Sequence, residues 1–425
     1  MVLRVALVFS LCIASAAQPA APGGQRGLDE YTLSQAVSEA LEKNLGLLAE
    51  KYRLGIADAR IATARLRPNP VLTAEGDHLD LLGTGYDSVN NAGPPEYSLR
   101  TDFVLERGGK RSSRIATAES AKGVAELELL NAIRGVAFDV EGAAVEVLLA
   151  KSNLALAMEN LSALHEIVRV NELRLKSGDL AEVELLRVQL AELQFENAVR
   201  QAQLRLDAAR ARLSLILGRN RTARLVDIVG DLRRETAPPK LEDLLAEAHN
   251  ARPDLRALRQ DQARSLAEVK LQIAQGKVDY TIGTEYRRQQ GLAGTGNSLG
   301  FFFSTSLPVF NRNQGEIARA TQEQKQIEAR LRQAQATVEN EVEVAFLQYD
   351  NARAILDRVE RTMLAKARDV RQITEFSYRR GEATLIEFLD AQRAYNDTIQ
   401  AYNEARAEFA KSLYAIDAAA GRGTP

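Results

Sequence analysis

The sequence predicts a mainly α-helical protein with a small β part and an internal duplication. Three observations support this prediction. The 425 residues are rich in strong helix formers and contain no Trp. The prolines leave residues 96–237 and 309–424 free of proline, so each block can form very long helices. The order of elements in the first half recurs in the second half at a spacing near 203 residues, measured from Gly178 to Gly381.

The N-terminal residues have the layout of a secretory signal peptide, which we predict over residues 1–17. Arg4 precedes an apolar run, Val5–Ile13, and small residues follow. A short membrane anchor is the alternative, but the run is too short to span a bilayer. Cys12 is the only cysteine and lies inside this segment. The mature chain would then have no thiol, and lipid attachment at Cys12 stays open.

Two repeats follow the signal. Each opens with an amphipathic helix, at Leu33 and at Leu241, that leads into a helix of some 25–35 residues, two strands and a helical hairpin. The first repeat is predicted over 28–230, with strands at 69–80 and 96–105 and a hairpin at 108–218. A linker spans 231–240, and the second repeat covers 241–421, with strands at 278–290 and 298–310 and a hairpin at 313–420.

Each hairpin needs its two helices to pack along their whole length. Lys110–Lys176 is proline-free and would form a helix roughly 100 Å long, which is not stable without a partner. The returning helix offers that partner, because its apolar and small residues recur at heptad spacing. These seam residues are Phe195, Val199, Ala202, Leu206, Ala209, Leu213 and Ile216.

The hairpins turn at two glycines that occupy equivalent positions. Gly178 and Gly381 can adopt the left-handed backbone that a helix end favours. Asp179 and Glu382 follow them, near the start of the next helix, where acidic groups are favourable. The chain should therefore have two hairpin tips that point the same way.

The strands are the part of the chain that suits a membrane. After residue 17 no run of 18 apolar residues occurs, so entry into a membrane would have to use strands. Strands of about ten residues can cross a bilayer when tilted. Four strands cannot close a barrel, whereas three copies would give twelve strands, an even number typical of bacterial barrels. A soluble sheet that caps a helical bundle is the alternative.

Several classes of function find no support in the sequence. The formal net charge is −2, which does not indicate nucleic-acid binding. Gly108-Gly109-Lys110 lacks the spacing and the Ser or Thr of a phosphate-binding loop. The three histidines are isolated, no cluster has metal-ligand spacing and no nucleophile elbow occurs. We therefore expect no enzyme activity, no cofactor and no metal-binding site.

Three stretches and the two glycine tips resemble the TolC family of outer-membrane efflux factors, over essentially the whole mature chain. The stretches are RPNPVLT at 67–73, LERGGKR at 105–111 and LPVFNRNQGEIARA at 307–320. GGKR and FNRNQG are similar to its CzcC-like heavy-metal branch. The resemblance implies a homotrimeric α-helical barrel of coiled-coil hairpins, continued by a 12-stranded outer-membrane β-barrel with four strands per chain.

The resemblance also implies that the tips form the closed periplasmic entrance. Its residues would be Gly178, Glu184, Tyr378, Gly381, Glu387 and Asp390. In a trimer Glu387 and Asp390 would form carboxylate rings that concentrate cations. Some relatives carry an arginine two residues after the second glycine, where this chain has Ala383, so Arg379 or Arg380 would have to replace it. An ordinary solvated helix face is the alternative for Glu184 and Glu387.

The implied function is passive export through the outer membrane, with heavy-metal cations such as zinc, cobalt and cadmium as the favoured cargo. The implied partners are a periplasmic adaptor protein, an inner-membrane proton-driven pump of the RND type and outer-membrane lipid. Efflux of drugs or other small organic compounds, or a type I secretion duct, is the alternative within this architecture. An exported coiled-coil scaffold without a barrel is a separate possibility.

Overall fold

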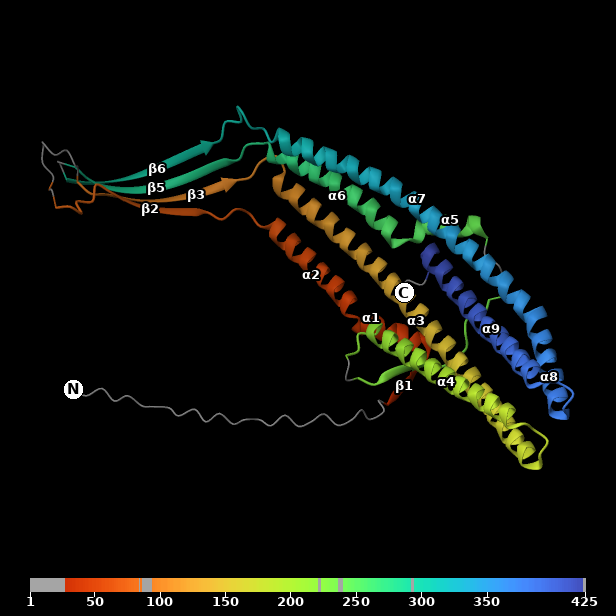
Figure 1. The fold of residues 1–425 in the computed structure, drawn as a ribbon. Coiled ribbons are helices and arrows are strands. Elements are labelled where there is room, and N and C mark those ends of the chain that lie inside the picture. Colours follow the sequence, from red (N-terminus) through yellow and green to blue (C-terminus); the bar gives the residue numbers. More distant parts are fainter. Residues whose placement is uncertain are drawn as a thin grey trace, which may run out of the picture.

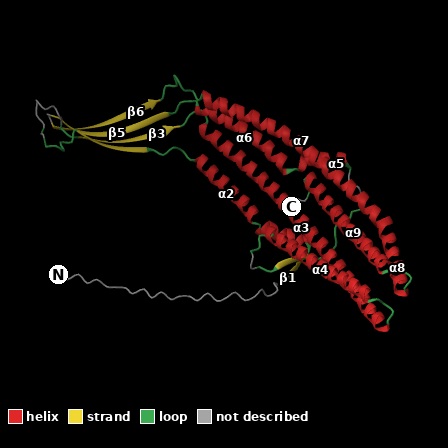
Figure 2. Ribbon diagram, viewed as in Figure 1, coloured by secondary structure: helices red, strands yellow, loops and turns green. Residues whose placement is uncertain are grey.

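A computed structural model describes residues 27–83, 85, 94–220, 223–235, 240–291 and 294–422. The predicted signal peptide, Cys12 and residues 236–239 of the linker lie outside these residues. The described chain is elongated, with a sheet at one end and long helices that run away from it (Figure 1). Figure 2 shows that helices make up most of the molecule, in agreement with the predicted fold class.

The longest helix is α3 (Lys110–Ser177), a single run of 68 residues. At 1.5 Å per residue it is about 100 Å long, as predicted. It turns back into α4 (Glu182–Ile216). All seven predicted seam residues of α4 are buried or partly buried, so the heptad prediction is confirmed. Before α3 come α1 (Leu33–Lys43) and α2 (Leu45–Arg65).

The second half contains the same kinds of helices. It begins with α5 (Leu241–Ala251) and α6 (Pro253–Gln275). A long run then comprises α7 (Gln314–Arg358), a π-helical turn η1 (Val359–Met363) and α8 (Leu364–Arg380). The run turns back into α9 (Leu385–Ala420). The turn between α8 and α9 falls 203 residues after the turn between α3 and α4. The same spacing separates the ends of α3 and α8, at 177 and 380, and the starts of α4 and α9, at 182 and 385.

In each half of the chain, a short break separates the first two helices: α1 from α2, and α5 from α6. Asn44 separates α1 from α2: its side-chain oxygen accepts from the backbone N–H of Leu47 at 3.0 Å. Its side-chain nitrogen donates to the carbonyl of Ile216 at 2.7 Å, which ties the break to the end of α4. Pro253 occupies the first position of α6, where its missing N–H costs nothing. The breaks therefore have identifiable causes.

Four strands form one antiparallel sheet in the order β2-β3-β5-β6. Their bounds are β2 (Val71–Asp77), β3 (Glu96–Leu105), β5 (Tyr280–Gly291) and β6 (Gly294–Thr305). β3 has the predicted bounds, and β2 and β5 lie within a few residues of theirs. The prediction for the last strand was wrong at both ends. β6 starts four residues earlier, in register with the end of β5, and ends before Leu307-Pro308, where proline lacks the N–H for the ladder.

A second, parallel pair joins β1 (Leu28–Tyr31) to β4 (Leu225–Ile228) and was missed from the sequence. Arg219 fixes this pair to the helices, because its guanidinium pairs with Asp29 at 2.7 Å and with Glu39 at 2.8 Å. Burial alone would raise the pKa of Glu39, but the hydrogen bond from Arg219 lowers it to about 2. The carboxylate is thus ionised throughout the neutral range.

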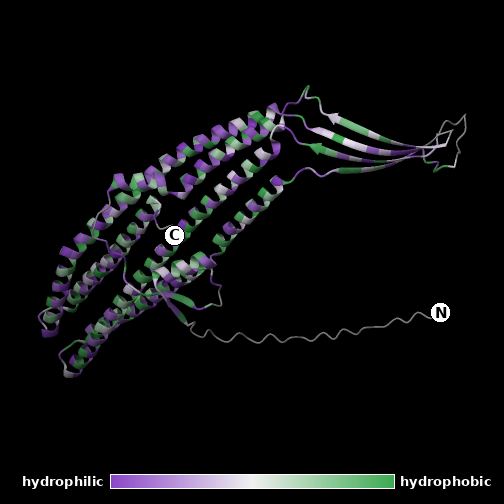
Figure 3. Ribbon diagram, turned by 180° about the vertical axis from the view of Figure 1, so that it is seen from behind, coloured by the Kyte–Doolittle hydropathy of each residue, from purple (hydrophilic) through white to green (hydrophobic). Residues whose placement is uncertain are grey.

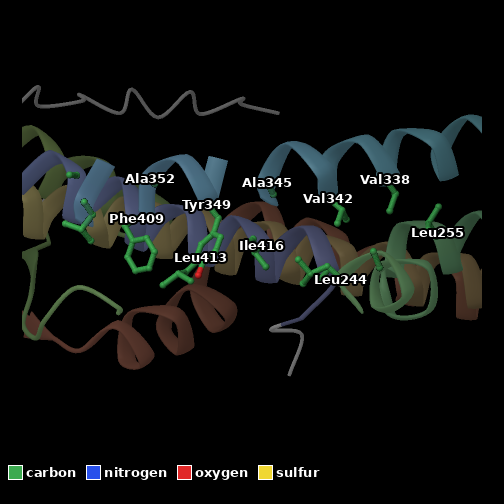
Figure 4. Packing of buried hydrophobic residues seen from close by; sticks show 14 residues of the cluster. Leu244, Leu255, Val338, Val342, Ala345, Tyr349, Ala352, Phe409, Leu413 and Ile416 are labelled. Carbon is green, nitrogen blue, oxygen red and sulfur yellow. The ribbon is translucent and has the colours of Figure 1, made fainter. Parts of the chain in front are cut away.

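The core consists of separate clusters along the helices. Figure 4 shows one of them, in which α5, α6, α7 and α9 meet around Tyr349 and Phe409. The two rings lie 5.6 Å apart, which is a favourable distance for aromatic packing. A second cluster joins α1, α3, α4 and β4 around Val147 and Leu213. Figure 3 shows apolar and polar residues interspersed along the helices.

We predict that Gly218, just after α4, tolerates no side chain. Its φ is 74°, and an added Cβ would lie 2.2 Å from the carbonyl oxygen of Lys43. Gly218→Ala should destabilise the protein by about 2–4 kcal/mol, since left-handed backbone and overpacking both cost energy. Thermal unfolding followed by far-UV circular dichroism measures the effect.

Gly135→Ala is the matched control: Gly135 lies within α3 with open space around it, so the change should be neutral or stabilise by about 0.5–1 kcal/mol. Equal melting temperatures for the two variants would contradict the prediction.

Candidate functional site at the hairpin tips

The two hairpin tips lie at the end of the molecule opposite the sheet (Figure 1). Gly178 and Gly381 adopt left-handed conformations, with φ of 83° and 78°, as predicted. After them, the N–H of Asp179 donates to the carbonyl of Arg174 at 2.8 Å, and that of Glu382 to the carbonyl of Ser377 at 2.9 Å. These bonds satisfy carbonyls that the helix ends would otherwise leave free. The tips therefore have closely similar backbones.

Glu387 has a local structural role that the sequence analysis missed. Its carboxylate accepts from the backbone N–H of Thr384 at 2.7 Å and from the Thr384 hydroxyl at 2.9 Å. The Thr384 hydroxyl in turn accepts from the Glu387 N–H at 3.3 Å, which completes a capping box at the start of α9. These bonds, led by that from the Thr384 backbone, lower the pKa of Glu387. The signal was present in the sequence as Thr-x-x-Glu.

Asp390 and Glu184 are the other two acidic residues predicted for the entrance. Asp390 is exposed and lies 3.5 Å from Arg393 on the same helix. Glu184 is partly exposed in the first turn of α4, where the helix dipole favours a negative charge. In the part of the chain that the structure describes, no group of three or more His, Cys, Asp or Glu side chains could hold a metal ion.

Tyr378 joins the two hairpins. Its ring is 5% exposed and stacks on Phe388 at 5.3 Å. The nitrogen and oxygen of the Asn171 side chain lie 2.8 and 3.1 Å from its hydroxyl. Asn171 belongs to α3 and is fully buried, so this contact crosses from the first hairpin to the second. Burial raises the pKa of Tyr378, which keeps the hydroxyl neutral and able to bond.

An apolar cluster surrounds this hydrogen bond. Its buried members come from both hairpins: Leu164, Ile167, Val168, Val188, Ala191, Tyr378, Leu385 and Phe388. Asn171 could have been found from the sequence, because Asn160, Leu164, Ile167 and Asn171 follow heptad spacing. A polar residue at a seam position commonly sets the register between helices.

The arginines near the second tip do not bridge the hairpins with their side chains. Arg379 pairs with Glu375 at 2.7 Å on its own helix, and Arg380 lies over the Phe376 ring at 4.1 Å. The hydrogen bond that joins the two tips is instead donated by an arginine of the first hairpin. Arg174 of α3 donates to the backbone carbonyl of Arg379. Within one chain, Arg174 therefore connects the two tips.

A groove lies between α3, α4 and α9 on the sheet side of the tips, where residues 146–160 of α3 and 396–404 of α9 line it. Its volume is about 670 Å³. Half of the lining residues are polar or charged, among them Asn153, Asn160, Gln201, Asn396 and Gln400, and the other half are alanines, leucines and Phe195. The groove therefore presents a mixed polar and apolar surface along the line where the two hairpins meet.

Two long helical hairpins joined to a small sheet define a helical coiled-coil channel fold. The profile of the outer membrane efflux protein family matches residues 36–219 and again 244–422, so the chain belongs to that family. The cobalt-zinc-cadmium resistance protein CzcC of Cupriavidus metallidurans is 24% identical over 372 residues, which are 85% of this chain and 83% of that protein. Nodulation protein T of Rhizobium leguminosarum bv. trifolii is 22% identical, over 92% of this chain and 85% of that protein.

A solved structure of CusC has the same fold. It superposes with a TM-score of 0.75 over 96% of this chain and 99% of that one, at 18% identity. Family membership places the protein in the Gram-negative outer membrane, with its helical part extending into the periplasm. Among the described helices, none combines the length and the apolar character that a membrane crossing requires.

We predict that the Tyr378 hydroxyl holds the tips together. Tyr378→Phe leaves the buried Asn171 amide without its partner, which should cost about 1–3 kcal/mol. Hydrogen exchange of the backbone around residues 164–191 and 376–391 should become faster.

Tyr402→Phe is the matched control, because the Tyr402 hydroxyl bonds to Glu360 at 3.3 Å away from the tips. Adding Asn171→Leu to Tyr378→Phe removes the unpaired amide and should restore part of the protection. Unchanged exchange at the tips of Tyr378→Phe would refute the prediction.

Proposed function

We propose that three copies of this chain form a passive export duct through the outer membrane. The observation that supports it most is the division of the four-stranded sheet into an apolar and a charged face. Alternate residues on β3, namely Tyr97, Leu99, Phe103 and Leu105, are about half exposed. On β5 and β6 the same face carries Ile282, Tyr286, Leu299, Phe301 and Phe303, which are also exposed. An exposed apolar face of this extent suits contact with lipid.

The opposite face of the sheet carries ion pairs. Arg100 pairs with Asp102 at 2.9 Å. Arg287 pairs with Glu285 at 2.9 Å and with Glu96 at 3.2 Å. Such a face is suited to a water-filled lumen. From Tyr97 to Leu105 the apolar side extends about 26 Å along the strand, comparable with the apolar band of outer-membrane barrels.

In the described part of the chain, the sheet has two open edges, β2 and β6. Unpaired edges are not tolerated in lipid, so the sheet needs further strands to close. Three copies joined from β6 to β2 would supply twelve strands. The six helical hairpins would then surround a tunnel, with the tips at its periplasmic entrance.

The proposal includes two repeats, residues 28–230 and 241–421. The hairpins turn 203 residues apart, and the family profile matches once in each half. Repeated units of this kind would place six similar hairpins around the tunnel of a trimer. Two similar tips per chain would then give the entrance an approximately sixfold arrangement.

For the cargo we propose heavy-metal cations. The name of the similar CzcC protein and the GGKR and FNRNQG stretches support this choice. Exposed Glu387 and Asp390 would add negative charge at the entrance. Energy would come from an inner-membrane proton-driven pump, reached through a periplasmic adaptor that docks near the tips.

The cargo is tested in a strain that lacks the gene. Its tolerance of zinc, cobalt, cadmium, nickel, copper and silver is compared with its tolerance of a drug panel. Selective metal sensitivity that the intact gene restores is the expected result. Sensitivity to drugs alone would reject metal cargo and favour efflux of small organic compounds.

The tip carboxylates should make the duct selective for cations. Glu387→Gln with Asp390→Asn removes their charge, and glutamine at position 387 still fits the capping box. In planar bilayers the reversal potential under a salt gradient should shift toward the non-selective value. Asp369→Asn, on an exposed part of α8 away from the tip, is the control and should have no effect. Unchanged selectivity of the double variant would return both residues to an ordinary solvated face.

A further inference from the structure

Four sequence stretches, 65–70, 105–114, 275–279 and 306–313, connect the sheet to the helices (Figure 1). The Arg111 side chain donates to the carbonyl of Arg65 at 2.7 Å. The backbone N–H of Arg107 donates to Asp279 at 2.9 Å. The Asn313 side chain donates to the carbonyl of Gln272 at 2.8 Å. These bonds bring residues that are far apart in the chain side by side at the junction.

This surface is strongly basic. The four stretches contain eight basic residues and two acidic ones, Glu106 and Asp279. Three of the basic residues form ion pairs: Lys110 with Asp279, Arg114 with Glu106, and Arg65 with Glu119. The other five are exposed and form no ion pair with any described residue: Arg67, Arg107, Arg111, Lys277 and Arg312. We call these five residues the junction collar.

Exposed apolar side chains accompany the collar. Phe310 is 92% exposed, Leu307 79% and Leu66 66%. Neighbouring Val309 is also largely exposed. Isolated apolar residues on a surface are ordinary, but here they are contiguous in sequence, beside cations and at the end of the apolar face of the sheet.

Arg107 connects the collar to that apolar face. Tyr280 pairs with Leu105 and Thr305 in the sheet register, so it lies on the apolar side. Its ring meets Phe303 edge-on at 5.2 Å, and the Arg107 guanidinium lies over it at 4.2 Å and bonds to its hydroxyl. An aromatic ring with a polar end beside a cation is typical of the boundary between hydrocarbon and headgroups.

We propose that the junction collar binds the phosphate groups of anionic phospholipids in the periplasmic leaflet of the outer membrane. The inference rests on the proposed function, because the apolar face of the sheet must lie in the bilayer. Guanidinium groups bind phosphate oxygens in pairs of hydrogen bonds, and lysine contributes a point charge. The exposed Leu307, Val309 and Phe310 would enter the boundary of the acyl chains. Lipid binding at the collar would fix the depth of the sheet in the membrane.

The test titrates the detergent-solubilised full-length protein with dioleoyl phosphatidylglycerol or dioleoyl phosphatidylcholine and counts bound lipids by native mass spectrometry. The parent should prefer phosphatidylglycerol. In a variant with Arg67→Gln, Lys277→Gln and Arg312→Gln, its apparent affinity should fall about tenfold or more, because each cation near an anionic surface contributes on the order of fivefold. Binding of phosphatidylcholine should stay unchanged.

Two further variants separate charge from folding. Arg187→Gln, Arg200→Gln and Arg330→Gln together remove three exposed cations on α4 and α7 that form no ion pair with described residues, and should leave lipid binding as in the parent. Arg67→Lys with Arg312→Lys keeps the charge and should keep most of the preference for phosphatidylglycerol.

Equal affinity of the parent for the two lipids would overturn the inference, as would a loss of affinity in the control variant as large as in the collar variant. Conductance of the parent in planar bilayers distinguishes the two proposals: a conducting parent without lipid preference rejects the collar alone, and a parent that forms no pore rejects the duct.

Discussion

The length of α3 is the constraint on which the rest of the structure depends. A helix of 68 residues has no intrinsic means of staying straight in water, so packing partners must cover it along its whole length. Toward the sheet α2 and α6 pack against it; toward the tips α4 and α9 do so, and α1 lies near the middle. One cluster of buried residues lies where α3 meets α1 and α4, and another lies near the tips where α3 meets α4 and α9. The elongated shape of the molecule follows from this succession of partners.

The contact surface between the first hairpin and the second, where α3 meets α8 and α9, contains more polar side chains than helix packing requires. Asn153 pairs with Asn403, Asn160 with Gln392, and Asn171 with Tyr378. Each pair crosses from α3 to α8 or α9. Apolar residues at these positions would bury more apolar surface. However, apolar contacts lose little free energy when one helix shifts along the other. Buried amides lose their partners when the register shifts, so these three pairs specify one alignment of the hairpins at some cost in stability.

Much of this fold could be predicted from the sequence because its signals are local. Heptad spacing and the absence of proline predicted α3 and α4, and Gly178 and Gly381 predicted the turns. The β1–β4 pair was missed because each strand has four residues and the partners lie 197 positions apart, from Leu28 to Leu225. The contact between Asn171 and Tyr378 was missed for a similar reason. Either residue could be assigned to a seam, but which seam positions face each other depends on how the two hairpins pack.

The two ends of the molecule differ in what one chain can complete. At the tips, a single chain supplies both hairpins, buries Tyr378 and satisfies Asn171. At the sheet, the described residues of a single chain leave the edges of β2 and β6 without partners and the apolar face exposed. Burial of that face and pairing of those edges require lipid and further strands, neither of which one chain can provide. Under the proposed threefold assembly, the sheet therefore depends on neighbouring copies for its integrity. The tips already have internal contacts, so they can change their contacts with neighbours while the sheet stays closed.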